Sequence, residues 1–155
     1  MPDPAKRDPS PVHLADEAAT TAFARKLAAT LQPGDTLALC GTLGAGKTTL
    51  AAALVAALGH GHHVTSPTFT LVHEYRTPGS TPVHHLDFYR LKDAAELPGL
   101  GWEDILDAPS IAIVEWADRF PGTLPRHTRW LTLSFPPPPA PEQTRIATWG
   151  PPEAQ

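Results

Sequence analysis

Two hydrophobic periods alternate along the middle of the chain, one typical of helices and one typical of strands. In the first segment, apolar residues recur at helical spacing at Leu14, Ala18, Phe23, Leu27 and Leu31. The pattern predicts a helix over residues 16–31, and the acids at positions 16 and 17 suit its N-terminus because negative charge is stabilised there. A second segment rich in Ala and Leu, 48–59, predicts a helix that ends at Gly59.

Strand patterns fill the segments between and after these helices. Some are short apolar runs, as in strands buried on both faces, and others alternate, as in strands with one covered face. They cover residues 36–41, 83–91, 110–117, 128–135 and 144–150, and residues 62–76 mix β-forming residues with a Ser-Pro turn. Residues 93–107 predict short helices broken at Pro98-Gly99. Helices interleaved with buried strands predict an α/β layered domain.

Composition narrows the class of protein. The chain has 155 residues, enough for one domain. Its net charge of -4, with no run of Lys or Arg, disfavours direct nucleic-acid binding. The single cysteine, Cys40, excludes a disulfide framework and a Cys-based zinc site. Because no apolar run is long enough for a membrane span, we expect a soluble cytoplasmic protein.

Proline marks the expected limits of the domain. Many of the 19 prolines cluster at the two ends of the chain, and such segments favour extended conformations. We therefore expect a flexible N-terminus over 1–12, a globular domain over 13–135, and a Pro-rich C-terminal segment over 136–155 with a short strand at 144–150.

A glycine-rich segment between a predicted strand and a predicted helix carries the clearest chemistry. GTLGAGKT (41–48) fits G-x-x-x-x-G-K-[ST], the phosphate-binding loop. Its glycines allow successive N–H groups to converge on an anion, and the helix that follows adds its positive end. The candidate nucleotide-binding residues are Gly41, Thr42, Leu43, Gly44, Ala45, Gly46, Lys47, Thr48 and Thr49. Lys47 is expected on the β/γ-phosphates, and Thr48 on Mg²⁺.

The loop predicts a nucleoside triphosphate, and the rest of the chain favours ATP. Guanine-specific proteins commonly read their base with an Asn/Thr-Lys-x-Asp motif, and the chain contains no asparagine. A small-molecule kinase needs a lid that carries several arginines. The arginines here are scattered along the sequence, so a kinase stays an alternative without a visible lid.

Two predicted strands end in an acid that could serve Mg²⁺. Glu115 follows an apolar β-branched run, and Asp87 follows a weaker run in VHHLDFYRL (83–91). Mg²⁺ bound to ATP needs only one or two carboxylates. One acid could hold the metal while the other orients or deprotonates the attacking water, so both are candidate catalytic and metal residues. The residues alone leave open which acid contacts the metal.

The histidines suggest other metal sites, but with weaker support. HGHH (60–63) could bind a metal, but histidines after a helix end are commonly just solvated. His84 and His85 point to opposite faces of their strand, so they cannot both ligate one ion from it. Trp116 directly follows Glu115, at the expected mouth of the site.

Several motifs together resemble one family. GTLGAGKTTL, VTSPTFTLVHEY, HHLDFYRL, ELPGLGWEDIL and IAIVEWADRF occur in the order and spacing seen in the TsaE (YjeE) family. These are P-loop ATPases of bacterial tRNA threonylcarbamoyladenosine biosynthesis. The resemblance covers roughly residues 14–135 and implies a three-layer P-loop NTPase domain with a central, largely parallel sheet flanked by helices.

The resemblance also implies a function and its partners. Family members are Mg²⁺-dependent ATPases, slow alone, that support turnover of a TsaD-type threonylcarbamoyl transferase and its TsaB-type partner at adenosine 37 of tRNAs reading ANN codons. They reach tRNA only through that complex. Position by position, Lys47, Asp87 and Glu115 match the catalytic residues, and Thr48, Glu115 and Asp87 match the magnesium site. Residues 65–69 match a switch-like loop, in which Thr68 is a candidate nucleotide contact.

Two positions depart from the family pattern. Thr42 stands where an Asp or Glu is common, which removes a negative charge beside the nucleotide, and His73 replaces a frequent Asn. Neither touches the expected chemistry. A nucleotide-gated assembly factor without essential hydrolysis remains an alternative, because binding needs only one metal ligand.

Overall fold

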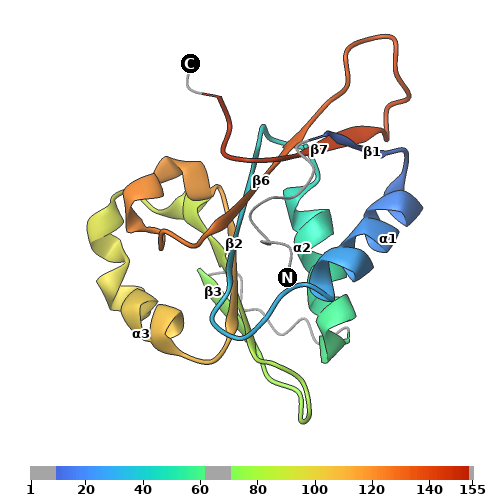
Figure 1. The fold of residues 1–155 in the computed structure, drawn as a ribbon. Helices are drawn as coiled ribbons and strands as arrows, with labels where there is room; N and C mark the ends of the chain where they lie inside the picture. The colour runs from blue at the N-terminus through green and yellow to red at the C-terminus, as the bar shows by residue number, and fades with distance from the viewer. Residues whose placement is uncertain (1–9, 62–70, 154–155) are drawn as a thin grey trace.

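The computed structural model describes residues 10–61 and 71–153, which form helices on both faces of one central sheet (Figure 1). The strands are β1 (Val12–Leu14), β2 (Thr36–Gly41), β3 (Val72–Tyr75), β4 (Val83–Asp87), β5 (Ile111–Glu115), β6 (Arg129–Ser134) and β7 (Arg145–Trp149). The α-helices are α1 (Glu17–Ala28), α2 (Lys47–Val55) and α3 (Trp102–Asp107). A π-helical turn, Ala56–His60, extends α2, and short 3₁₀ helices cover Phe88–Arg90, Ala94–Glu96, Pro98–Leu100, Ala117–Arg119 and Pro121–Thr123.

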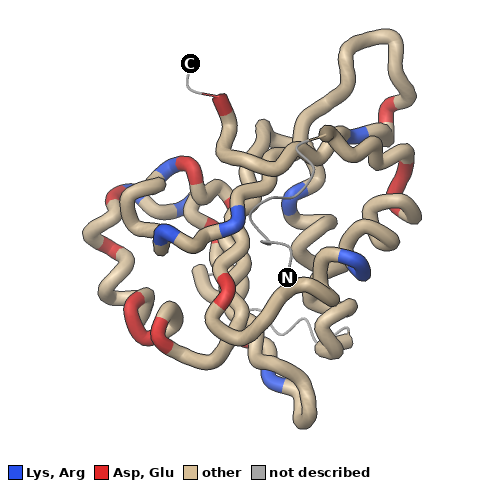
Figure 2. Tube along the Cα trace, in the orientation of Figure 1, with Lys and Arg blue, Asp and Glu red and all other residues tan. Residues whose placement is uncertain are grey.

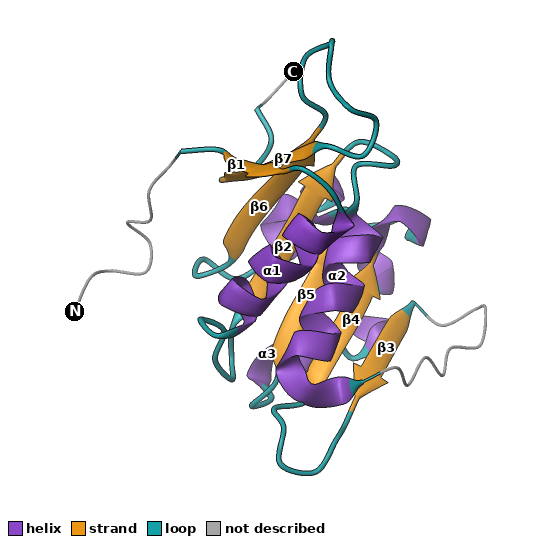
Figure 3. Ribbon diagram, turned by 90° about the vertical axis from the view of Figure 1, so that its right-hand side faces the viewer, coloured by secondary structure: helices purple, strands orange, loops and turns teal. Residues whose placement is uncertain are grey.

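The sheet has seven strands in the order β1-β7-β6-β2-β5-β4-β3 (Figure 3). The four central strands, β6, β2, β5 and β4, run parallel to one another. The outer pairs β3–β4, β6–β7 and β1–β7 are antiparallel. The expected α/β fold with a largely parallel sheet is therefore confirmed. The carboxyl ends of the parallel strands meet at one edge, where open α/β sheets bind ligands.

Each face of the sheet has its own core. Helices α1 and α2 cover one face, where Leu27 and Leu50 pack with Leu37, Ile113 and other strand residues. On the other face, α3 and the 3₁₀ turns cover a cluster that includes the fully buried Cys40 of β2. The alternating side chains of β2 and β5 supply both clusters, which explains why these strands read as continuous apolar runs.

Helix and strand limits follow local chemistry. Helix α1 begins after Asp16, whose Oδ1 accepts a hydrogen bond from the N–H of Ala19 at 2.9 Å. Leu14, which fits the helical spacing, instead ends β1 and pairs with Arg145 of β7. The sequence did not predict β1, because three residues are too few to show an alternating pattern. Gly59, with φ at 99°, breaks regular helical geometry near the end of the extended α2.

Charged residues of both signs are distributed over the fold. Lys and Arg are spread over separate elements and interspersed with Asp and Glu (Figure 2). Across residues 10–61 and 71–153, no helix is long and apolar enough to cross a membrane.

Candidate functional site

The phosphate loop leads from the end of β2 into α2, as its motif predicts. Three of its glycines adopt positive φ: Gly41 at 140°, Gly44 at 80° and Gly46 at 101°. A Cβ on Gly41 would lie 2.4 Å from the carbonyl oxygen of Leu133 in β6, so no larger residue fits there. Gly46 precedes α2 without a side-chain cap, which leaves the first amides of the helix free to bind an anion.

Lys47 is held at the centre of the loop. Its Nζ donates hydrogen bonds to the carbonyl oxygens of Gly41 at 2.6 Å and Thr42 at 2.9 Å. The same ammonium lies 4.0 Å from the ring centroid of Trp116, within cation–π range. Burial lowers the pKa of Lys47, and the negative charge of Glu115 partly opposes this. A phosphate that reaches Lys47 would replace these carbonyl contacts with charged ones.

Glu115 is a buried acid at the end of β5 with both carboxylate oxygens occupied. Its Oε1 accepts a hydrogen bond from Thr48 Oγ1 at 2.7 Å. Its Oε2 lies 2.6 Å from Nε2 of His85. Burial alone would raise the pKa of Glu115, but the hydrogen bonds from His85 and Thr48 and the charge of Lys47 outweigh it and lower the pKa. Glu115 is thus ionised at neutral pH and fixed in orientation.

Asp87 lies beside Glu115, because β4 and β5 pair these two residues in register. Its Oδ1 accepts a hydrogen bond from the N–H of Tyr89 at 2.9 Å and caps the 3₁₀ turn that follows. The side chain is partly exposed. The two acids predicted from the sequence are therefore brought to the same edge of the sheet, one buried and one accessible to solvent.

An aromatic pair and an arginine organise the mouth of the site. Trp116 has φ at 57°, an uncommon conformation for a large side chain, and its ring lies 4.9 Å from that of Tyr89. Arg119 Nη1 donates to the carbonyl oxygens of Phe88 at 2.8 Å, Tyr89 at 2.5 Å and Leu91 at 2.7 Å. The segments that follow the two acids are thereby joined.

A small cavity of about 140 Å³ adjoins the other side of the phosphate loop. Gly44 and Thr49 line it together with Glu17 and Thr20 of α1. Arg145 of β7 also lines it, and Arg145 Nη2 donates to the carbonyl oxygen of Gly44 at 3.2 Å. The cavity therefore offers space and polar groups beside the loop for a part of a ligand other than its phosphates.

The sequence did not assign roles to His85 or Arg119. For His85, the signal was available: the two-residue period of a strand places it on the same face as Asp87. The contact of Arg119 with three carbonyls carries no sequence signature. Thr68 and the rest of residues 65–69 lie outside the described residues.

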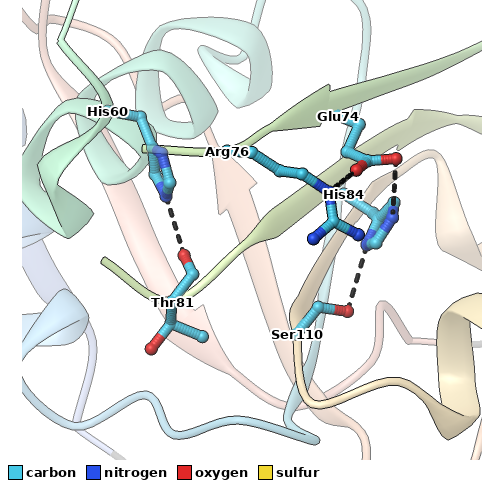
Figure 4. A network of polar contacts seen from close by, with 6 residues as sticks. All are labelled: His60, Glu74, Arg76, Thr81, His84 and Ser110. Atoms are coloured by element: carbon cyan, nitrogen blue, oxygen red, sulfur yellow. Dashed lines mark hydrogen bonds and ion pairs between the residues drawn. The ribbon is translucent and has the colours of Figure 1, made fainter. Parts of the chain in front are cut away.

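Other candidate groups have structural roles. His84 Nδ1 lies 3.0 Å from Ser110 Oγ, and its Nε2 lies 3.5 Å from Glu74, which also pairs with Arg76 (Figure 4). The arrangement Ser110–His84–Glu74 resembles the catalytic triad of a hydrolase, but Ser110 is only 4% exposed, so a substrate cannot reach its hydroxyl.

Across residues 10–61 and 71–153, no group of three or more His, Cys, Asp or Glu side chains could hold a metal ion, and His62 and His63 of the histidine-rich turn lie outside these residues. The described histidine of this turn, His60, is buried, and its two ring nitrogens lie 3.1 Å from Thr77 Oγ1 and 2.7 Å from the carbonyl oxygen of Thr81 (Figure 4).

Comparison with known proteins gives the family of this chain. The model of the TsaE family, described as "Threonylcarbamoyl adenosine biosynthesis protein TsaE", matches residues 14–138. The chain belongs to the TsaE family. It is 39% identical over 118 residues to the "tRNA threonylcarbamoyladenosine biosynthesis protein TsaE" of Haemophilus influenzae, covering 73% of this chain and 74% of that one. A Nostoc protein of the same name is 42% identical over 113 residues, covering 71% and 69%.

A solved structure supports the same relationship. The crystal structure of YdiB from Bacillus subtilis superposes with a TM-score of 0.70 at 30% identity, covering 90% of this chain and 83% of that chain. The chain thus shares its sequence with TsaE proteins and its fold with YdiB, and the phosphate loop and acids described above lie within the region that the family model matches.

The site residues fit a magnesium-bound nucleotide. Thr48, Asp87 and Glu115 supply the hard oxygen atoms that Mg²⁺ prefers. Lys47 and the loop amides supply the positive charge and N–H donors that phosphates require.

Proposed function

We propose that this chain is a Mg²⁺-dependent, cytoplasmic ATPase that supports threonylcarbamoyladenosine formation at position 37 of tRNAs reading ANN codons. One observation carries the proposal: the acid at the end of β5 meets the phosphate loop. Glu115 accepts a hydrogen bond from Thr48, and Lys47 lies over the ring of Trp116, the residue after Glu115. Asp87 is paired with Glu115 across β4 and β5. Membership of the TsaE family connects this site to tRNA modification.

In this proposal, one set of residues binds the phosphates and another positions the metal ion and the attacking water. The loop amides and Lys47 bind the phosphates, and Lys47 exchanges its two carbonyl acceptors for phosphate oxygens. Thr48 and Glu115, with Asp87 on the open side, would hold Mg²⁺, which when bound neutralises charge on the phosphates. Asp87 is the more accessible acid, so it orients the attacking water and accepts its proton.

The partners follow from the family. We propose that the chain acts with a TsaD-type transferase and a TsaB-type protein, and that hydrolysis resets their assembly between catalytic cycles. The net charge of -4 and the mixed distribution of charged residues support this arrangement, because a subunit whose partners carry the tRNA needs no tRNA-binding surface of its own (Figure 2).

Two variants test the proposal. We expect Lys47→Ala to lose ATP binding in calorimetric titration. Asp87→Ala is expected to keep ATP affinity within about threefold while losing steady-state hydrolysis and repeated modification cycles in an assay reconstituted with the transferase partners. Asp104→Ala, which removes an exposed acid on α3, is the matched control and should behave as the unmodified chain.

Two outcomes would replace this function. Full multi-turnover modification by Asp87→Ala would make the chain a nucleotide-gated assembly factor in which hydrolysis is incidental. Transfer of labelled phosphate from ATP to a small metabolite, instead of to water, would make it a kinase.

A further inference from the structure

A second cavity lies at the opposite end of the parallel strands from the phosphate loop. It has a volume of about 560 Å³, within the range of small-molecule sites. The first residues of β6 line it, together with the turn that precedes β2 and the end of β7. Its lining residues include Arg126, His127, Thr128, Arg129, Trp130 and Trp149. Two of these residues, Arg126 and Arg129, lie three positions apart in a chain whose net charge is -4.

Arg129 is held in place within this cavity. Its Nη1 donates to Thr30 Oγ1 at 2.9 Å, and its guanidinium carbon lies 4.9 Å from the ring centroid of Trp149. The hydrogen bond and the aromatic face fix the plane of the guanidinium before any ligand arrives. Such a fixed plane favours two-point contact with a carboxylate or phosphate.

Two polar atoms of this cavity lack an acceptor. Arg129 Nη2 and Thr128 Oγ1 are buried without a hydrogen-bond partner among the described residues. Thr128 is only 9% exposed. A buried donor without an acceptor is unfavourable, and both atoms are closed off from bulk solvent. Both residues line the cavity, so an acceptor group on a bound ligand can supply the missing hydrogen bonds.

The charge and shape of the cavity define its ligand. Arg126 and Arg129 outnumber the one lining carboxylate, Asp35, whose Oδ2 already accepts from the N–H of Gln32 at 2.8 Å. Trp130 and Trp149 add flat apolar walls. We propose that this cavity is a binding site for a small organic anion, in which Arg129 and Thr128 bind a carboxylate or phosphate group and the tryptophans contact a flat apolar body.

Residue-resolved NMR of the full chain tests this site. We would titrate benzoate, phenyl phosphate and the neutral analogue benzamide, and follow the backbone amides of residues 127–129 and the indole N–H of Trp130 and Trp149. We expect the two anions to shift these signals with a dissociation constant of about 1 mM, and benzamide to leave them unchanged. The two anions also separate carboxylate from phosphate recognition. Phosphate binding at Gly44 and Gly46 gives separate signals.

Variants decide whether Arg129 and Thr128 form the site. Arg129→Gln should weaken binding at least about tenfold, since a charged hydrogen bond is lost. Arg129→Lys keeps the charge and the buried stem if Arg129→Gln fails to fold, and should weaken binding less. Thr128→Val should weaken it several-fold, and the exposed Arg25→Gln should have no effect. Equal binding of benzamide, unchanged binding in Arg129→Gln, or no shifts outside the phosphate loop at roughly 10 mM anion would each overturn the proposal.

Discussion

At the residue scale, the position of Glu115 depends on a neighbour that lies outside the phosphate loop. Thr48 holds one carboxylate oxygen and His85 holds the other, so the acid cannot rotate without breaking a hydrogen bond. His85 reaches Glu115 because β4 and β5 are adjacent and parallel. We infer that His85 is a positioning residue for Glu115 and acts only through it.

Replacement of His85 should therefore affect the metal more than the nucleotide. We expect His85→Ala to raise the Mg²⁺ concentration that gives half-maximal ATPase activity by about 10–100-fold, as loss of such an outer partner commonly does. Nucleotide affinity without Mg²⁺ should stay nearly unchanged. His85→Gln, whose amide can still donate, should recover part of the loss.

The exposed His13→Ala serves as the control for His85 and should match the unmodified chain. A His85→Ala protein with normal Mg²⁺ dependence would show that Glu115 is positioned without His85.

At the element scale, the sequence predicted the strands and the phosphate loop better than the turns that complete the site. Continuous apolar runs located β2 and β5, and the motif located the eight residues from Gly41 to Thr48. The positive φ of Trp116 and the contacts of Arg119 could not be predicted, because both depend on how the segments after β4 and β5 meet in space. Local sequence patterns indicate burial and turn type, but they do not indicate contacts between segments that are distant in the sequence.

Arg119 couples these two turns, and its loss should displace Asp87. We expect Arg119→Gln to lower the steady-state ATPase rate by up to about 100-fold, because small misplacements of a catalytic group have effects of this size. ATP affinity should change little, since Lys47 and the loop amides are not moved. Arg119→Lys should retain more activity than Arg119→Gln.

The measurement is single-turnover hydrolysis beside calorimetric ATP binding, with thermal unfolding to show that each variant remains folded. An equal loss of binding and of hydrolysis in Arg119→Gln would contradict a role limited to Asp87.

At the scale of the whole molecule, one buried histidine makes stability depend on pH. Burial lowers the pKa of His84, and Glu74 opposes this only in part. The unfolded chain takes up a proton near its ordinary pKa of about 6.5, while the native chain resists it. The contribution of His84 to stability is therefore complete above about pH 6.5 and is lost as the pH falls below it.

Urea unfolding between pH 7.5 and 5 measures this dependence. We expect the free energy of unfolding to fall on acidification with a slope of at most about 1.4 kcal/mol per pH unit from this group. His84→Gln should flatten the slope in this range. The lowered pKa of Glu115 acts in the same direction only below about pH 4.5, so the two effects separate. An unchanged slope in His84→Gln would exclude His84 as its source.

The burial of Cys40 within β2 also has a chemical consequence for the whole molecule. Burial, foremost, raises the pKa of this thiol to about 12, and Cys40 is the one cysteine in the sequence. Thiolate is the form that reacts with oxidants and alkylating agents, so the native chain offers them almost no nucleophilic sulfur at neutral pH. A cysteine introduced on the exposed face of α3 would be the single labelling position of the folded protein, and modification of Cys40 itself would mark the moments when the sheet comes apart.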